Sequence, residues 1–249
     1  MRRYPLYIFD LDGTLFRGNQ PIPDAVEAVR HLRSEGAQIR YLTNNSSTTR
    51  AVYKDKLESM GYEAHEQEIY SSATGSASRL QELHIQTVFV LGEPGLVETL
   101  EQSDLEVVPP NQHPEALLVG ICRTLTYDLL NDAMQVGLSG ARFFATNTDS
   151  TYPLEGGAEV PGAGSIVAAV RTCLGREPEV FGKPNPYLID LILQEASLKP
   201  ADALVIGDRY ETDILAGINA ACDTLHVLTG VNRSSPKGQA STSTLLDLV

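Results

Sequence analysis

The sequence predicts an α/β protein with a Rossmann-like parallel-sheet core and an inserted α/β cap domain. Strand-like and helix-like segments alternate at both ends of the 249-residue chain. Four short polar clusters each come directly after an apolar run. A long middle stretch separates the second cluster from the third and has an alternating pattern of its own. Such alternation is typical of parallel sheets with helices on their faces.

The amino-terminal part supplies the first two strands and helices. Apolar residues at helical spacing, followed by Gly36 and Gly61, mark where the two helices end. The predicted order is strand Tyr4–Phe9, helix Asp24–Glu35, strand Ile39–Leu42 and helix Thr48–Met60.

The carboxyl-terminal part resumes the same alternation, and we expect it to complete the same sheet. Its predicted elements are helix Tyr187–Ala196, strand Ala203–Ile206, helix Thr212–Ala220 and a last strand Thr224–Leu228.

The middle stretch has enough strands and helices for a second α/β layer. We expect strand Thr87–Leu91, helix Gly95–Gln102, strand Ala116–Val119, helix Tyr127–Leu138 and strand Arg142–Ala145. We therefore divide the chain into a catalytic core, residues 1–74 and 176–249, and an inserted cap domain, residues 75–175.

Composition excludes several classes of function. The net charge of −13 argues against a nucleic-acid polymer as partner, because such partners require a basic patch. No apolar run is long enough for a membrane span, so we expect no membrane association. Cys122, Cys173 and Cys222 are scattered, and we interpret them as reduced core thiols of a cytoplasmic protein.

The first cluster carries two aspartates, Asp10 and Asp12, at the end of the first strand. An ionised carboxylate can attack phosphorus, and a carboxyl group two residues later can protonate the leaving oxygen. Gly13 lets the chain turn sharply after them. Taken alone, the pattern is more often a turn or helix cap.

The second and third clusters offer groups that suit phosphate oxygens. Thr43 has a hydroxyl group, Asn44 a backbone amide and Lys183 a cation. Each has a simpler reading, as turn material or as a solvent-facing lysine. Lys183 does not belong to a P-loop, because Glu177 stands where that motif has its first glycine. Pro161–Gly164 likewise lacks the third glycine of a dinucleotide loop, and we interpret it as the start of a helix.

The fourth cluster adds Asp208 and Asp213, either of which could instead cap a helix. Gathering the four clusters at one sheet edge would place four carboxylates together, and their charges would repel one another. A divalent cation with hard oxygen ligands relieves that repulsion. We expect Mg²⁺, with Mn²⁺ or Co²⁺ as substitutes.

The chain resembles the haloacid dehalogenase-like superfamily over essentially its whole length. The motifs D-x-D-G-T-L and G-D-x-x-x-T-D, with T-N and K-P between them, carry the resemblance. The position of the insertion resembles the branch with the larger α/β cap, in particular its nitrophenyl phosphatase, nucleotide phosphatase and phosphoglycolate phosphatase group. Further matching segments are Arg17–Gly18, Pro21–Pro23, Gly120 with Arg123–Tyr127, Ala145–Asp149, Pro161–Gly164 and Leu228–Val231.

The resemblance implies a role for each residue of the clusters. Asp10 would be the nucleophile and Asp12 the general acid and base. Asp10, the carbonyl group of Asp12 and Asp208 would hold the metal. Thr43, Asn44 and Lys183 would hold the phosphate, and Asp213 would support the site.

The function we expect is Mg²⁺-dependent hydrolysis of small soluble phosphate monoesters through an aspartyl-phosphate. Nucleoside monophosphates, sugar phosphates and aryl phosphates are favoured as substrates. The alternatives are a phosphoglycolate or pyridoxal phosphate phosphatase, or a phosphotransferase that uses the same phosphoenzyme. A non-catalytic phospho-receiver is disfavoured, because receivers are shorter and have no use for Asp12. The sequence leaves both a monomer and a homodimer open.

Substrate choice is expected to come from the cap, since the four clusters can contact only the phosphoryl group and the metal. The segment Ala145–Pro153 follows a predicted strand and carries Asn147, Asp149 and Tyr152. We expect it to close over the core and contact the leaving group. A plain turn capped by Asn and Asp is an equally good reading.

Overall fold

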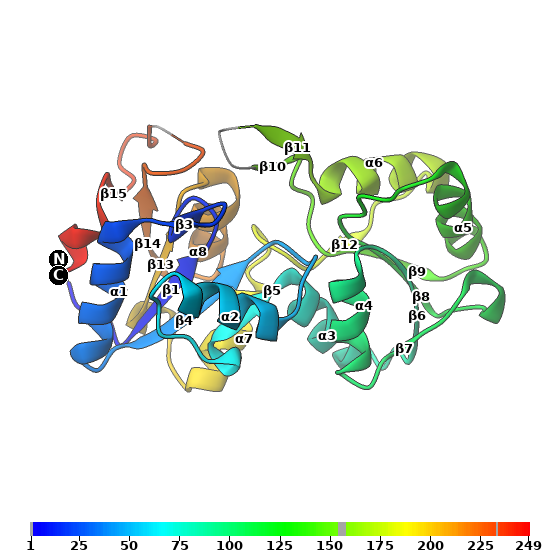
Figure 1. Cartoon of the computed structure of the whole chain (residues 1–249). Helices are drawn as coiled ribbons and strands as arrows, with labels where there is room; N and C mark the ends of the chain where they lie inside the picture. The colour runs from blue at the N-terminus through cyan, green and yellow to red at the C-terminus, as the bar shows by residue number, and fades with distance from the viewer. Residues whose placement is uncertain (1, 154–157, 233) are drawn as a thin grey trace.

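The computed structural model describes residues 2–153, 158–232 and 234–249 and contains two parallel sheets, one in each half of the molecule (Figure 1). The first sheet has six strands in the order β15-β14-β13-β1-β4-β5, all paired in parallel. Their bounds are β1 Leu6–Asp10, β4 Gln38–Thr43, β5 Ile69–Ser71, β13 Ala203–Gly207, β14 Asp223–Val227 and β15 Ser241–Thr242.

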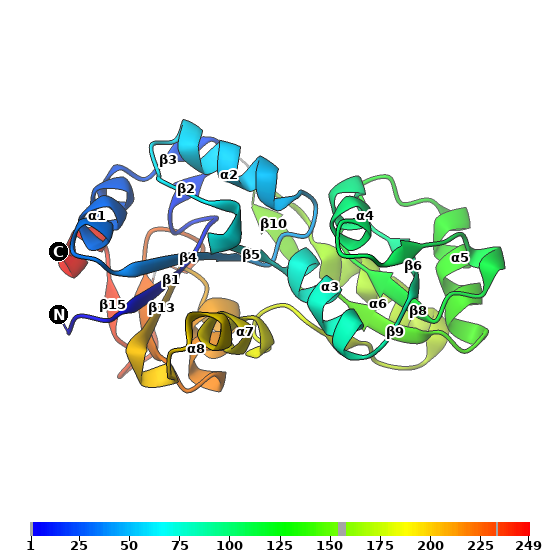
Figure 2. The same cartoon turned by 90° about the horizontal axis from the view of Figure 1, so that it is seen from below.

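Helices cover both faces of this first sheet, as the view from below shows (Figure 2). On one face lie α1, Pro23–Ser34, and α2, Arg50–Ser59, which pack on the β1 side chains Tyr7 and Phe9. On the other lie α7, Tyr187–Ala196, and α8, Leu215–Asn219, which pack on Leu6 and Ile8. Strand β1 is therefore apolar on both faces, as expected for the centre of a parallel sheet.

The second sheet is formed mainly by the middle of the chain and has the order β12-β9-β8-β6-β7, again all parallel. Helices α5 and α6 pack on one of its faces, and α3 and α4 on the other. The strands are β6 Thr87–Leu91, β7 Glu106–Val107, β8 Ala116–Val119, β9 Arg142–Ala145 and β12 Glu179–Val180. The helices are α3 Ser72–Glu82, α4 Pro94–Glu101, α5 Tyr127–Leu138 and α6 Ala163–Leu174.

Two short hairpins complete the described strands. One pairs β2, Phe16–Arg17, with β3, Gln20–Pro21, directly after β1. The other pairs β10, Thr151–Pro153, with β11, Glu159–Pro161, ahead of α6. Within the described parts of the chain, no helix is long and apolar enough to cross a membrane.

The structure confirms the predicted α/β class with a parallel core sheet and a second, inserted parallel sheet. The division at residues 75 and 175 stays a prediction. Short strand β12 joins the second sheet from beyond residue 175.

Two expectations, one about the last strand and one about a cysteine, were wrong. Thr224–Leu228 is not the last strand, because β15 pairs with β14 after it. Cys173 lies exposed on α6 and is not a core thiol, whereas Cys122 and Cys222 are buried, and all three are free. The expected helix start at Pro161–Gly164 is confirmed, since α6 begins at Ala163 with Gly162 as its N-cap.

Candidate active site

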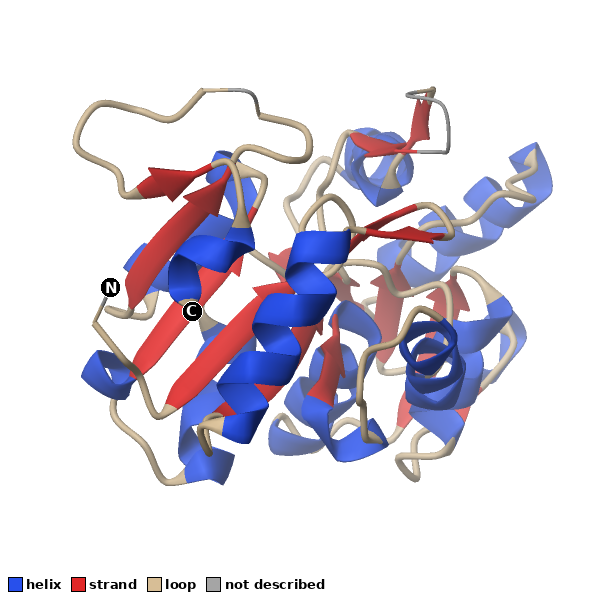
Figure 3. Cartoon of the chain, turned by 60° about the vertical axis from the view of Figure 1, so that its left-hand side comes forward, coloured by secondary structure: helices blue, strands red, loops and turns tan. Residues whose placement is uncertain are grey.

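The polar clusters meet where β1, β4 and β13 end. The three strands are neighbours in the core sheet and run in the same direction (Figure 3), so their carboxyl ends lie at one edge. Asp10 and Thr43 are the final residues of β1 and β4, and Asp208 follows β13. A cavity at this edge is lined by residues of all four clusters and by residues of the second sheet's half.

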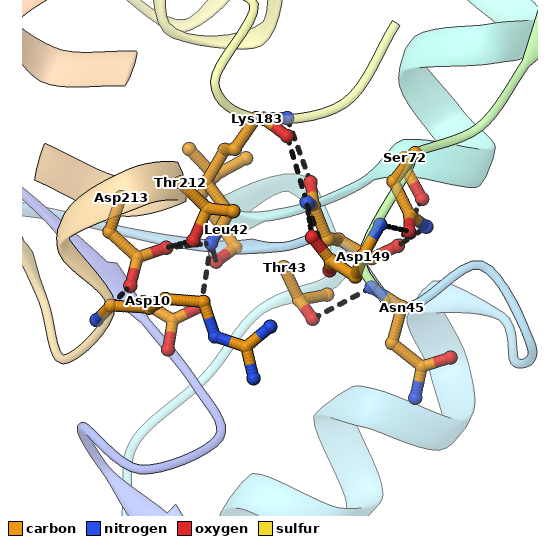
Figure 4. A network of polar contacts seen from close by, with 12 residues as sticks. Asp10, Leu42, Thr43, Asn45, Ser72, Asp149, Lys183, Thr212 and Asp213 are labelled. Carbon is orange, nitrogen blue, oxygen red and sulfur yellow. Dashed lines mark hydrogen bonds and ion pairs between the residues drawn. The ribbon is translucent and has the colours of Figure 1, made fainter. Parts of the chain in front are cut away.

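Lys183 lies between two carboxylates at the centre of the site (Figure 4). Its Nζ is 2.6 Å from Oδ1 of Asp10 and 2.7 Å from Oδ1 of Asp213. It also donates to the backbone carbonyl of Leu42 at 3.3 Å. The lysine is only 3% exposed, so its ammonium group interacts with these partners and not with solvent. Because both carboxylates attract it, the pKa of Lys183 is raised despite its burial.

Asp213 is held by the turn that precedes α8. Its carboxylate accepts from the backbone N–H of Arg209 at 2.9 Å, besides its ion pair with Lys183. A Cβ atom on Gly207 would come within 2.2 Å of the Asp213 side chain, so only glycine fits there. Asp213 thus holds the ammonium group of Lys183 in place.

The carboxylate of Asp208 is enclosed by two backbone segments. Its Oδ2 accepts from the N–H of Val231 at 2.5 Å. A Cβ atom on Gly13 would lie 2.5 Å from Oδ2, and one on Gly230 would lie 1.8 Å from it. Gly13 also has φ = +93°, which side chains rarely adopt. The turn after β1 and the segment after β14 therefore both depend on glycine to approach Asp208.

Asp10, Asp208 and Asp213 form a set of donors that could hold a metal ion. Each offers one carboxylate oxygen, these oxygens lie within 4.8 Å of one another, and all three residues are buried. Hard oxygen donors of this kind favour Mg²⁺ or Ca²⁺ over softer metals. The resemblance implied Asp10, the Asp12 carbonyl group and Asp208 as ligands, and it gave Asp213 a supporting place.

Burial shifts the pKa of these carboxyl groups strongly. Loss of hydration raises the pKa of Asp10 well above 3.8, with Asp213 adding to the rise and Lys183 opposing it. Loss of hydration also raises the pKa of Asp208, to about 7, again with Asp213 adding to the rise. Lys183 alone does not balance the cluster, so a bound cation would stabilise its ionised form.

Asp12 lines the same cavity from the turn after β1. Burial raises the pKa of its carboxyl group, and the cations of Lys56 and Lys183 oppose the rise. The ammonium group of Lys56 lies 4.1 Å above the ring centre of Phe16, which forms a backbone bridge with Asp12. The environment therefore favours the protonated form of Asp12 that an acid needs.

Thr43 and Asn44 reach the site from β4. The Thr43 hydroxyl group accepts from the N–H of Asn45 at 3.1 Å, which forms a tight turn beside the cavity. The side-chain amide of Asn44 brackets Lys183: its Oδ1 accepts from the Lys183 N–H at 2.8 Å, and its Nδ2 donates to the Lys183 carbonyl at 3.0 Å. Asn44 therefore fixes the backbone from which the lysine extends.

Asn44 also joins the two halves of the molecule. Its Nδ2 donates to both carboxylate oxygens of Asp149, at 3.1 and 3.2 Å. Its backbone carbonyl accepts from Nδ2 of Asn147 at 2.7 Å. The hydroxyl group of Tyr152 accepts from Nδ2 of Asn45 at 3.4 Å. The structure thus brings Asn147, Asp149 and Tyr152 to the cavity from the segment after β9.

Sequence reasoning gave no role to Arg209 or Val231, which both line the cavity. Arg209 lines the cavity, and its charge opposes the burial-raised pKa of both Asp149 and Asp208. Its place directly after Asp208 was the available signal. Val231 supplies a backbone N–H to Asp208, which a sequence does not reveal because any residue except proline has that group.

Comparison with known proteins is consistent with this geometry. Residues 7–106 match a family model described as haloacid dehalogenase-like hydrolase, and residues 180–246 match one described as HAD-hydrolase-like. The chain is 34% identical to an acid sugar phosphatase of Staphylococcus epidermidis, over 93% of this chain and 89% of that protein. It is 35% identical to a 5′-nucleotidase of Bacillus subtilis, over 94% and 90%.

Solved structures agree over nearly the whole chain. A p-nitrophenyl phosphatase from Archaeoglobus fulgidus superposes with a TM-score of 0.92 at 34% identity, covering 99% of this chain and 98% of that one. A glycerol phosphate phosphatase from Mycobacterium tuberculosis in complex with magnesium superposes with a TM-score of 0.89 at 31% identity, covering 98% and 77%. The same protein has also been solved in complex with calcium.

Proposed function

Since this chain belongs to the phosphatases of the haloacid dehalogenase-like hydrolase family, we propose that it hydrolyses small phosphate monoesters through an aspartyl-phosphate on Asp10, with Mg²⁺ as cofactor. The observation that carries the proposal is the buried arrangement of Asp10, Lys183, Asp208 and Asp213 at one sheet edge. Burying three carboxylates costs stability, and a catalytic use accounts for that cost better than a structural one does.

In the first step, a carboxylate oxygen of Asp10 attacks the phosphorus atom of the ester. The bond between phosphorus and the leaving oxygen breaks as the bond to Asp10 forms. Asp12 gives its proton to the leaving oxygen, so the product departs as an alcohol. Lys183 stays against Oδ1 of Asp10, which leaves the other carboxylate oxygen available.

In the second step, Asp12 is ionised and takes a proton from a water molecule as that water attacks phosphorus. The bond between phosphorus and Asp10 breaks, which releases inorganic phosphate and restores the carboxylate. Thr43 and the N–H of Asn44 are assigned to the phosphoryl oxygens, and Lys183 balances the negative charge that Asp10 and the phosphoryl group share.

The donor set fits a magnesium ion. Asp10 and Asp208 would hold it with the Asp12 carbonyl group, and Asp213 would keep Lys183 in place. A bound Mg²⁺ would supply Lewis-acid stabilisation of the phosphoryl charge. Loss of hydration, with Asp213 adding to it, raises the pKa of Asp10 and Asp208, and a bound cation would offset both effects, which supports this assignment.

We propose that residues 75–175 act as a cap on the core formed by residues 1–74 and 176–249, and that the cap selects the leaving group. Asp149 and Tyr152 line the cavity from the cap side. Arg123, a cap cation, is paired with Glu93 at 3.3 Å, which offsets its positive charge. These features support nucleoside monophosphates, sugar phosphates and aryl phosphates over leaving groups with further acidic groups, and the names of the relatives agree.

A phosphate-release screen tests the proposal. Purified enzyme is incubated with a broad panel of phosphate monoesters in Mg²⁺, in Ca²⁺ and in excess chelator. We expect turnover in Mg²⁺ only, because Ca²⁺ prefers more and longer oxygen contacts and would displace the reacting groups. Full activity in chelator would refute the metal requirement. Absence of phosphate release from every ester, with protein that is folded by circular dichroism, would refute the phosphatase itself.

A further inference from the structure

His226 is a buried histidine whose ring reaches the backbone of Asp208. It lies on β14, next to β13, and is 0% exposed. Its Nε2 is 3.0 Å from the carbonyl oxygen of Asp208, and its Nδ1 is 2.9 Å from the hydroxyl oxygen of Ser235. The ring of Tyr210 lies beside it, with centroids 6.1 Å apart.

These two contacts determine which ring nitrogen of His226 carries the hydrogen. A carbonyl oxygen can only accept, so Nε2 carries the hydrogen and donates it to Asp208. In the tautomer with its hydrogen on Nε2, Nδ1 accepts from the hydroxyl group of Ser235. Both ring nitrogens are satisfied in a fully buried place, and the ring is held in one orientation.

Asp208 needs more than its side-chain contacts to be held in place. The Val231 N–H holds the carboxylate, and Gly13 and Gly230 leave space for it. The position of the carboxylate also depends on the position of the Asp208 backbone. The Asp208 carbonyl group accepts from the N–H of Asn232 at 3.4 Å, a long contact, and from His226 at 3.0 Å. His226 is therefore the shorter of the two anchors on that carbonyl group.

We propose that His226 is a positioning residue for the metal site: its Nε2–H holds the backbone of Asp208 so that the carboxylate points into the donor set. The inference rests on the proposed function, because it takes Asp208 to be a ligand of Mg²⁺. Removal of a group that orients a metal ligand typically lowers metal affinity by about 10–100-fold.

A purely structural role makes a different prediction. A histidine that only fills space would, on replacement, lower the melting temperature and leave the affinity of the folded protein for metal unchanged. The two roles are separated by measuring Mg²⁺ binding directly, without turnover, on protein that is folded.

Three replacements of His226 form a matched series. In His226→Gln the side-chain amide can place a donor where Nε2 lies, whereas in His226→Asn it reaches only the position of Nδ1. His226→Leu has no donor. Leu225→Ala, at the neighbouring buried position of β14, serves as a control that weakens packing without contacting Asp208.

The experiment is isothermal titration of each metal-free protein with MgCl2, combined with thermal melts in chelator and in Mg²⁺. We expect His226→Asn and His226→Leu to weaken Mg²⁺ binding about 10–100-fold, His226→Gln to stay within a few-fold of wild type, and Leu225→Ala to lower the melting temperature with unchanged affinity. The Gln and Asn variants decide the question if His226→Leu does not fold.

Equal affinities for wild type, His226→Gln and His226→Asn would overturn the positioning role while leaving the proposed function intact. Equally weak binding by the Gln and Asn variants would also overturn it, because retention of the donor would then have no effect. If wild type itself shows no Mg²⁺ binding, the metal part of the proposed function fails, and the inference fails with it.

Discussion

The ammonium group of Lys183 lies 2.6 Å from Oδ1 of Asp10, although the two residues are 173 positions apart in the chain. Both are buried, and Lys183, which also pairs with Asp213, is the cation that offsets the charge of Asp10 in this poorly solvated site. Removing one member of such a pair leaves an uncompensated charge, which is far more costly than losing an exposed ion pair.

We therefore predict that Lys183→Met destabilises the protein by about 3–5 kcal/mol and lowers kcat/KM by about 10²–10³-fold. Urea unfolding and phosphate release measure the two effects. Lys237→Met, which removes an exposed lysine, is the matched control and should change neither quantity. Activity of Lys183→Met within a few-fold of wild type would show that this cation has no part in the reaction.

Asp12→Asn should lower kcat strongly for alkyl phosphates, because the leaving oxygen then departs without a proton. General acid–base groups typically contribute about 10²–10⁴-fold. The loss should be much smaller for p-nitrophenyl phosphate, since a nitrophenolate ion leaves without help. The measurement is kcat for both esters in both proteins. The acid role is wrong if the two esters lose activity by the same factor.

The stability of the metal-free protein should fall as the pH rises from about 3.8 to about 7, because of Asp208. Its folded pKa is raised to about 7 from 3.8, so the folded state keeps a proton that the unfolded state has lost. That contribution is fully present below pH 3.8 and is lost as the pH passes through the folded pKa. Thermal melts in chelator across this range measure it.

Asp208→Asn is the control for that pH dependence. Without an ionisable group at this position, its melting temperature in chelator should fall less over the same range and should exceed that of wild type at pH 7. Mg²⁺ should raise the melting temperature of wild type at pH 7 but not that of the variant. If the melting temperatures of the two proteins change with pH in parallel, Asp208 is not the source of the pH dependence.

The cap segment should affect substrates unequally. We predict that Asp149→Ala and Tyr152→Ala change kcat/KM by different factors for a nucleoside monophosphate, a sugar phosphate and p-nitrophenyl phosphate, because the leaving groups differ in size and polarity. Asn147→Ala should lower all of them more evenly, since Asn147 is buried and uses its amide on the Asn44 carbonyl group, whereas Asp149 and Tyr152 are partly exposed in the cavity. The selection role of the segment fails if each variant gives one common factor for every substrate.

Much of the fold was accessible from the sequence because its elements carry strong periodic patterns. Strands β6, β8 and β9 and helices α5 and α7 have the predicted bounds. Helix α3 was missed because Ser72–Glu82 is rich in small residues and lacks a clear apolar stripe. Strand β15 was missed because it has only two residues, and tertiary pairing with β14 defines it.

The candidate site was predictable where a short motif carries the chemistry. Asp10, Asp208 and Lys183 stand out because polar residues follow buried strands, and parallel strands bring their ends together. The contacts that hold these residues were not predictable. The bond from Val231 to Asp208 uses a backbone N–H, and the bracket of Asn44 around Lys183 joins segments 139 positions apart. Neither leaves a pattern in the sequence.

The most direct test of the central claim is chemical trapping of the phosphoryl group on Asp10. Enzyme turning over p-nitrophenyl phosphate in Mg²⁺ is quenched in acid and reduced with borohydride, which converts an aspartyl-phosphate to homoserine, and the peptides are analysed by mass spectrometry. We predict homoserine at position 10 in wild type, more of it in Asp12→Asn, and none in Asp10→Asn. Homoserine at another aspartate, or its absence from wild type and Asp12→Asn while p-nitrophenyl phosphate is hydrolysed, would contradict the assignment of Asp10 as the nucleophile.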